Sequence, residues 1–179
     1  ARLADLASPL YALLKSTVKY TWSDRMEEAF TRIKQELCSP TVLVPFDPQK
    51  PIVLATDASP YGISAVLSHR FPDNSERPIA FYSRVLTETE QRYSQIDKEA
   101  LGIKNGVERF FYYIFGRRFT LITDSRPLSQ IFAPERTLPA LSATRMQHYA
   151  VYLTGFSFDI VYRPTKLHGN ADALSRLPI

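Results

Sequence analysis

The sequence predicts an α/β fold in which helices cover a single mixed sheet. Three short apolar runs, at 51–55, 62–70 and 77–84, are separated by brief turns, a pattern typical of an antiparallel meander. A long helical stripe follows them and leads to a fourth strand at 117–124. This strand–helix–strand crossover implies that part of the sheet is parallel. Alternating apolar residues at 156–163 predict a fifth strand.

The composition is that of a globular chain with a mild excess of positive charge. Of the 179 residues, 45% are hydrophobic and 22% are charged, so we expect a packed core rather than wholesale disorder. The net charge of +4 is compatible with a polyanionic partner but does not require one. A single cysteine, Cys38, excludes an intrachain disulfide framework and favours a reducing compartment. No apolar run is long enough for a transmembrane helix.

Residues 1–48 have a different, helical character. Leucines recur at helical spacing near the start, and Ser23 fits the N-cap of a second helix. The proline-rich stretch 39–51 ends this pattern and is the predicted boundary. We therefore predict a helical segment at 1–48 and a sheet domain at 49–179.

Helices of the sheet domain are expected between and after its strands. Thr87 and Glu90 fit a capping box at the N-terminus of one long helix. Gly116 is the expected C′ residue at which this helix ends. A second helix is expected at about 141–153, and a short last helix at 170–177. The apolar stripe of the long helix consists of Tyr93, Ile96, Ala100, Ile103, Val107, Phe110 and Ile114.

Four carboxylates stand out by their positions. Asp57 and Asp124 each end the apolar run of a strand, so neighbouring parallel strands would bring both to one edge of the sheet, where such folds usually carry their sites. Glu99 flanks the buried stripe of the long helix and faces the sheet. Asp172 lies in the last short helix. Taken singly, each acid is more often a turn, cap or solvent-exposed residue, and only their convergence in one fold indicates a site.

Carboxylates gathered at a partly buried edge repel each other and require neutralisation. Divalent cations supply it, and hard oxygen ligands favour Mg²⁺ or Mn²⁺. No cluster of Cys and His in the sequence offers a competing zinc site. Two such ions held about 3.5–4 Å apart are suited to phosphodiester hydrolysis.

Four motifs carry a resemblance to a known family: TDAS at 56–59, KEAL at 98–101, TDSRPL at 123–128 and NADALSRL at 170–177. The stretches ERPIAFYSRVL, QRYSQIDKEAL, GRRFTLITD and FSFDIVYRPTK extend it over 49–179. Together they closely resemble the ribonuclease H domain of reverse transcriptases from LTR retrotransposons of the Ty3/gypsy type. The lead-in is similar to the segment that joins the polymerase thumb to ribonuclease H in those Pol polyproteins.

The resemblance implies a ribonuclease H-like fold, a mixed five-stranded sheet flanked by helices. Its first three strands are antiparallel, and its first, fourth and fifth are parallel. It also implies a hydrolase, an endonuclease that cuts the RNA strand of RNA–DNA hybrids during reverse transcription. Carried over by motif, the catalytic and metal-binding residues are Asp57, Glu99, Asp124 and Asp172. They would hold two Mg²⁺ ions, for which Mn²⁺ can substitute.

The resemblance further implies two partners, the RNA–DNA hybrid and the polymerase domain of the same polyprotein, and no membrane. It implies a cytoplasmic location in a retroelement particle. The expected substrate contacts are Ser59, Tyr61, Ser125, Arg126, His168 and Asn170. Arg117, Arg118, Arg163 and Lys166 could add contacts to the nucleic-acid backbone, although a basic residue of this kind is more often only a solvated surface charge.

The sequence departs from the family pattern in three places. Relatives commonly have His-Lys where Ser125-Arg126 stands, so the imidazole is lost while a cation is kept. Gly102 stands where relatives usually carry Ala, and together with Gly106 it favours close helix–sheet packing over substrate approach. His168 lies nearer the last acid than the mobile His of many ribonucleases H, and a single loop His is more often only solvated.

Two other functions remain open on the sequence alone. The domain could be a catalytically inactive tether that grips the hybrid, or a host-adopted nucleic-acid-binding module; four intact acids weigh against this, and the altered Ser125-Arg126 pair leaves it open. It could also be another nuclease of the same superfold, such as an integrase or a junction resolvase. The intervals of 42, 25 and 48 residues between successive acids suit ribonuclease H better.

Overall fold

The computed structural model describes residues 9–10, 13, 20–37, 42–133, 144–164, 171 and 175. The chain divides into two compact units, Ala1–Val44 and Pro45–Ile179. In the first unit, helix α2 spans Asp24–Leu37 and begins directly after Ser23, as predicted. Most of the predicted leucine-rich first helix lies outside the described residues. None of the helices in the described ranges is long and apolar enough to cross a membrane.

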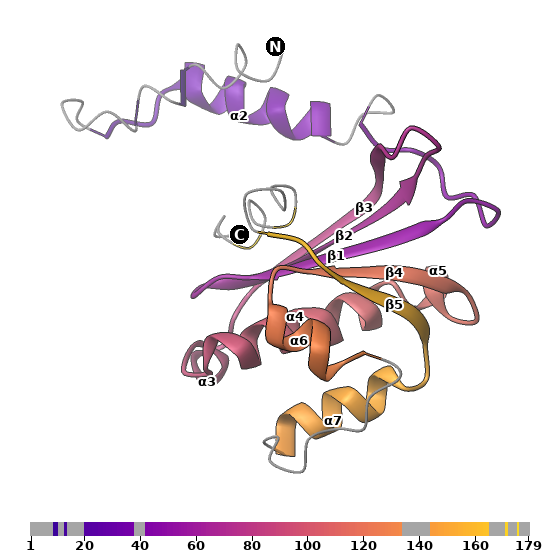
Figure 1. The fold of residues 1–179 in the computed structure, drawn as a ribbon. Coiled ribbons are helices and arrows are strands. Elements are labelled where there is room, and N and C mark those ends of the chain that lie inside the picture. The colour runs from indigo at the N-terminus through magenta and orange to yellow at the C-terminus, as the bar shows by residue number, and fades with distance from the viewer. Residues whose placement is uncertain are drawn as a thin grey trace. The chain divides into compact units, whose positions relative to one another are not determined.

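The second unit is built on one five-stranded sheet with the order β3-β2-β1-β4-β5, visible in Figure 1. The strands are β1 (Ile52–Ala58), β2 (Gly62–Arg70), β3 (Glu76–Val85), β4 (Arg118–Thr123) and β5 (Ser157–Tyr162). Strand β2 is antiparallel to both β1 and β3. Strand β4 is parallel to both β1 and β5. This mixed sheet confirms the predicted fold class.

The helices of this unit are α3 (Glu88–Gln91), α4 (Gln95–Arg109), α5 (Phe111–Ile114), α6 (Arg126–Ile131) and α7 (Thr144–Leu153). The prediction of one unbroken helix from Thr87 was wrong. The capping box of Thr87 and Glu90 is present but serves only the single turn of α3. The Ser94 side chain accepts a hydrogen bond from the Asp97 backbone N–H and opens α4 as a second N-cap. The closing residue was predicted correctly, because Gly116 follows α5 with φ of 72°.

Two apolar layers enclose the centre of the sheet. On one face, the stripe of α4 packs against Leu54 and Leu67 in the main core cluster. On the other face, Val53, Val66 and Ile122 form a second cluster with Ala171. Ala171 belongs to the C-terminal segment, residues 165–179, of which the structure describes only Ala171 and Ser175. Every residue of β1 is therefore buried, as its continuous apolar run predicted. The end of β1, which carries Asp57, is fixed from both sides.

Candidate metal centre

Three of the four predicted acids converge at one edge of the sheet. Asp57 lies near the end of β1, and Asp124 directly follows β4, so the parallel pairing of these strands brings both to the same edge. Glu99 comes from the second turn of α4, which packs on β1 and β2. One carboxylate oxygen from each of the three residues lies within 4.8 Å of the others. The convergence inferred from strand ends and helical spacing is thus present for these three.

The remaining predicted acid cannot be placed. Asp172 lies outside the described residues, as do His168 and Asn170. Their roles therefore stay predictions. The flanking residues Ala171 and Ser175 are described, and the Ser175 hydroxyl donates a hydrogen bond to Oδ2 of Asp57 at 2.5 Å.

Burial and mutual repulsion dominate the electrostatics of the centre. Asp57 and Glu99 are 3% and 6% exposed. Burial, followed by the charges of Asp57 and Asp124, raises the pKa of Glu99 to about 9. A hydrogen bond from Gln95 Nε2 to Glu99 Oε1, at 2.6 Å, works in the opposite direction. Three carboxylates this close together repel one another when all are ionised, so a bound cation would stabilise them. All three offer oxygen ligands, which fit a divalent cation such as Mg²⁺.

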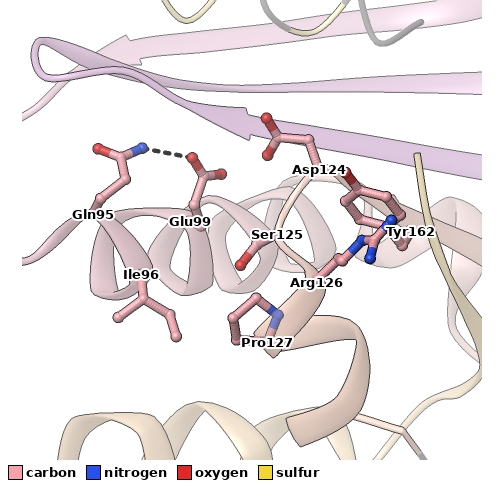
Figure 2. Close-up of a pocket in the computed structure, with 8 residues that line it drawn as sticks. All are labelled: Gln95, Ile96, Glu99, Asp124, Ser125, Arg126, Pro127 and Tyr162. Carbon is pink, nitrogen blue, oxygen red and sulfur yellow. Dashed lines mark hydrogen bonds between the residues drawn. The ribbon is translucent and has the colours of Figure 1, made fainter. Parts of the chain in front are cut away.

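A cavity of about 450 Å³ opens beside these acids. Figure 2 shows its lining residues: Gln95, Ile96, Glu99, Asp124, Ser125, Arg126, Pro127 and Tyr162. The guanidinium of Arg126 lies 4.7 Å from the centroid of the Tyr162 ring, a cation–π arrangement that holds the charge beside the cavity. The cavity is therefore lined by the carboxylates of Glu99 and Asp124 and by the guanidinium of Arg126.

The predicted substrate contacts lie in different environments. Ser125 and Arg126 line the cavity, and Tyr61 is 66% exposed. Ser59 points inward instead: it is 2% exposed, and its hydroxyl donates to the Ser175 carbonyl and accepts from the Gly62 backbone N–H. Ser59 was expected to contact the substrate, but its hydroxyl is enclosed between Gly62 and Ser175.

The additional basic residues are largely engaged within the domain. Arg118 pairs with Asp159 through two hydrogen bonds, and Arg163 does the same with Glu76. The Arg117 guanidinium lies 5.4 Å from the centroid of the Phe46 ring. Lys166 lies outside the described residues.

Three residues of the site were not identified from the sequence: Gln95, Tyr162 and Ser175. Gln95 precedes Glu99 by one helical turn, so the spacing carried a usable signal. Tyr162 ends β5, the strand parallel to β4, and could have been found from strand order. Ser175 lies 118 residues from Asp57, and no local pattern connects them.

Sheet order, helix placement and the acids at the shared end of β1 and β4 define the ribonuclease H-like class of α/β folds. The chain belongs to the family of RNase H-like domains found in reverse transcriptases, whose sequence model matches residues 22–121. This confirms the family inferred from the motifs.

The chain is also similar to a retrotransposon polyprotein. It is 35% identical over 178 residues to the Transposon Tf2-3 polyprotein of Schizosaccharomyces pombe (strain 972 / ATCC 24843), which covers 98% of this chain and 13% of the polyprotein. The chain therefore spans about an eighth of the length of this relative.

Solved structures support the fold. The native prototype foamy virus protease–reverse transcriptase matches with a TM-score of 0.67 and 18% identity, over 92% of this chain and 22% of that chain. A foamy viral protease–reverse transcriptase in complex with an RNA/DNA hybrid matches with a TM-score of 0.56 and 21% identity, over 98% of this chain and 23% of that chain.

Proposed function

We propose that this domain is a ribonuclease H that hydrolyses the RNA strand of RNA–DNA hybrids as part of a retroelement reverse transcriptase. The observation that carries the proposal is the convergence of Asp57, Glu99 and Asp124 on one edge of the sheet. Membership of the RNase H-like family supports hydrolysis as the reaction. The three carboxylates offer only oxygen ligands, which suit a divalent cation.

The residues of the chain hold and orient the reacting groups. Asp57, Glu99, Asp124 and, by its motif, Asp172 would bind two Mg²⁺ ions. Bound divalent cations activate water and stabilise charge on a phosphate that is being cleaved. Burial of β1 on both faces keeps Asp57 in place, and Gln95 holds the carboxylate of Glu99.

Substrate recognition is proposed for Tyr61, Ser125 and Arg126 and, from the sequence motif alone, for His168 and Asn170. Tyr61 offers an aromatic surface, and Arg126 offers a cation held by Tyr162 beside the cavity. Ser125, His168 and Asn170 are proposed to complete the contacts to phosphates and 2′-hydroxyls. The complex of a foamy viral enzyme with an RNA/DNA hybrid supports the class of ligand.

The wider setting is proposed from the relatives. Residues 1–48 would correspond to a thumb or connection segment, and the polymerase domain of the same polyprotein would be the protein partner. The domain would act in the cytoplasm, inside a retroelement particle. Similarity to a transposon polyprotein over 98% of the chain supports this setting.

A cleavage assay tests the function. The 179-residue chain with Mg²⁺ should cut the RNA strand of an end-labelled hybrid and spare the DNA strand. Asp57→Asn should abolish cutting while the melting temperature changes little. Asp159→Asn, a matched change at a residue 55% exposed on β5, should cut like the wild type.

Three results would redirect the assignment. Hybrid binding without cleavage at any Mg²⁺ or Mn²⁺ concentration would indicate a binding tether or host-adopted module. Cleavage of a pure DNA duplex would point to an integrase- or resolvase-like nuclease. Normal cutting by Asp57→Asn would show that the site is elsewhere.

A further inference from the structure

Two residues of the C-terminal segment are tied to the β1–β2 hairpin by buried serines. The Ser64 hydroxyl donates to the Ala171 carbonyl at 2.6 Å, and the Ser59 hydroxyl donates to the Ser175 carbonyl at 2.5 Å. The Ser175 hydroxyl donates in turn to Oδ2 of Asp57 at 2.5 Å. None of these three serines is more than 2% exposed. Ser175 is thus attached to the strand that carries Asp57, and Ala171 to its partner strand β2.

Backbone packing at Gly62 shows the same close approach independently of the hydroxyl groups. A Cβ atom at Gly62 would lie 2.9 Å from the Ser175 carbonyl oxygen and 3.0 Å from the Arg84 carbonyl oxygen. Real Cβ atoms do not approach backbone this closely, so any side chain here would displace the segment. Gly62 and Ser59 therefore fix where the Ser175 backbone lies.

The bond from Ser175 acts directly on a proposed metal ligand. Asp57 is 3% exposed, and a buried carboxylate needs donors to offset lost hydration. Donation to Oδ2 sets the rotation of the carboxyl plane, and it places a neutral donor beside a group that already faces two other acids. Ser64 lies opposite Asp57 in the antiparallel pair of β1 and β2, but its hydroxyl donates to the Ala171 carbonyl and not to the Asp57 carboxylate.

We propose that Ser175 is a positioning residue for divalent-cation binding: its hydroxyl orients the Asp57 carboxylate and couples docking of the C-terminal segment to the metal centre. This inference rests on the proposed function, because it assumes that Asp57 binds a cation. It assigns a role to a residue 118 positions from Asp57 in the chain.

Cation titration of the full 179-residue chain tests this role. Mn²⁺ binding is followed by calorimetry and by the loss of the free-ion electron paramagnetic resonance signal, alongside thermal melting. Ser175→Ala should weaken Mn²⁺ binding about ten-fold, the low end of the effect of losing an outer-shell partner. Its Mg²⁺-dependent cleavage should recover when Mg²⁺ is raised by a similar factor.

Two variants separate positioning from tethering. Ser64→Ala removes an anchor of the same segment and should lower the melting temperature, while Mn²⁺ affinity changes less than about three-fold. Ser175→Cys keeps nearly the same volume but donates weakly, so it should bind Mn²⁺ as weakly as Ser175→Ala. It also carries the test if the alanine variant does not fold.

The contrary outcomes are distinct. Equal loss of Mn²⁺ affinity in Ser64→Ala and Ser175→Ala would mean that Ser175 only tethers the segment. Wild-type affinity in Ser175→Cys would mean that shape, not hydrogen bonding, matters. Unchanged affinity in all variants would also overturn the role of Ser175. A wild-type chain that neither binds Mn²⁺ nor cuts the hybrid would contradict the proposed function itself.

Discussion

Arg163 forms a bidentate ion pair with Glu76, although the two residues belong to opposite edges of the sheet. Arg163 directly follows β5, Glu76 begins β3, and the two nitrogen–oxygen distances are 2.9 and 2.6 Å. Arg70, at the end of β2, also donates to Glu76 at 3.0 Å. These strand ends occupy diagonal corners of the sheet, and its twist brings such corners together over one face.

We expect this pair to contribute to stability rather than to hybrid binding. Burial opposes ionisation of Glu76, but hydrogen bonds from Arg163 and Arg70 outweigh it and lower the pKa of Glu76. A double-mutant cycle of Arg163→Met and Glu76→Gln should give a coupling energy of about 1–2 kcal/mol in urea unfolding. Hybrid affinity of Arg163→Met should stay close to that of the wild type. Additive effects on stability, or a clear loss of hybrid affinity, would contradict this.

The ion pair between Arg84 and Glu90 predicts a pH dependence of stability. Two hydrogen bonds from Arg84, at 2.7 and 2.8 Å, together with one from the Thr87 backbone, lower the pKa of Glu90 from 4.5 to about 2 against the effect of burial. A pKa lowered by folding stabilises the protein above pH 4.5, and this stabilisation is lost as the pH falls towards 2.

Arg84→Met should therefore flatten the acid limb of the stability profile. Unfolding by urea from about pH 5 down to pH 2 should show the wild type losing about 1 kcal/mol more than the variant, after allowance for solvent screening. Lys104→Met is the control, since it breaks an i,i+4 pair in which Glu108 is 55% exposed. Parallel profiles for Arg84→Met and the wild type would exclude the role of this pair.

The parts of the site that could be predicted from the sequence are those with a local signal. Asp57 and Asp124 were identifiable because each ends an apolar run, and the parallel crossover then places both at one edge. Glu99 was identifiable because helical spacing sets it beside a buried stripe. For these three residues, the local pattern of apolar residues predicts both the place in the strand or helix and the side of the element on which the carboxylate lies.

The contacts that escaped prediction join residues distant in the chain or depend on competing local signals. Ser175 with Asp57 and Arg163 with Glu76 lie 118 and 87 residues apart, so only the folded sheet brings them together. The break before α4 had a local cause. Ser94 acts as a second N-cap and starts a new helix, although the apolar stripe continues across the break.

The two glycines of α4 should respond differently to alanine. A Cβ atom at Gly102 would lie 3.4 Å from the Asp57 carbonyl oxygen, an ordinary contact. At Gly106 it would lie 3.0 Å from both Ala65 Cβ and Thr56 Cγ2. Gly102→Ala should therefore stabilise the fold by about 0.5–1 kcal/mol through helix propensity, whereas Gly106→Ala should destabilise it by about 1 kcal/mol or more.

Thermal melting of both glycine variants checks this, with cleavage measured in parallel. Gly102→Ala should keep its activity, because the added methyl contacts backbone rather than the acids. A melting temperature that falls as far in Gly102→Ala as in Gly106→Ala would show that the helix lies closer to β1 than the structure has it.

Gln95 connects the metal ligand Glu99 to the end of strand β1. Its Nε2 donates to Glu99 Oε1 at 2.6 Å and to the Ala58 carbonyl at 2.8 Å, so one amide ties the helix carboxylate to the end of β1. Loss of this donor should raise the pKa of Glu99 further and free its carboxylate to rotate. Gln95→Ala should therefore lower the cleavage rate at limiting Mg²⁺ about ten-fold.

The rate of Gln95→Ala should recover when Mg²⁺ is raised or when the pH is raised, because both favour ionised Glu99. Gln91→Ala is the matched control. Its Nε2 donates to the Leu86 carbonyl at 3.1 Å, and within the described part of the chain this side chain donates to no acid. A rate defect in Gln95→Ala that neither Mg²⁺ nor pH relieves would indicate that Gln95 contacts the substrate directly, because a group acting only through Glu99 has no effect once that carboxylate is ionised and metal-bound.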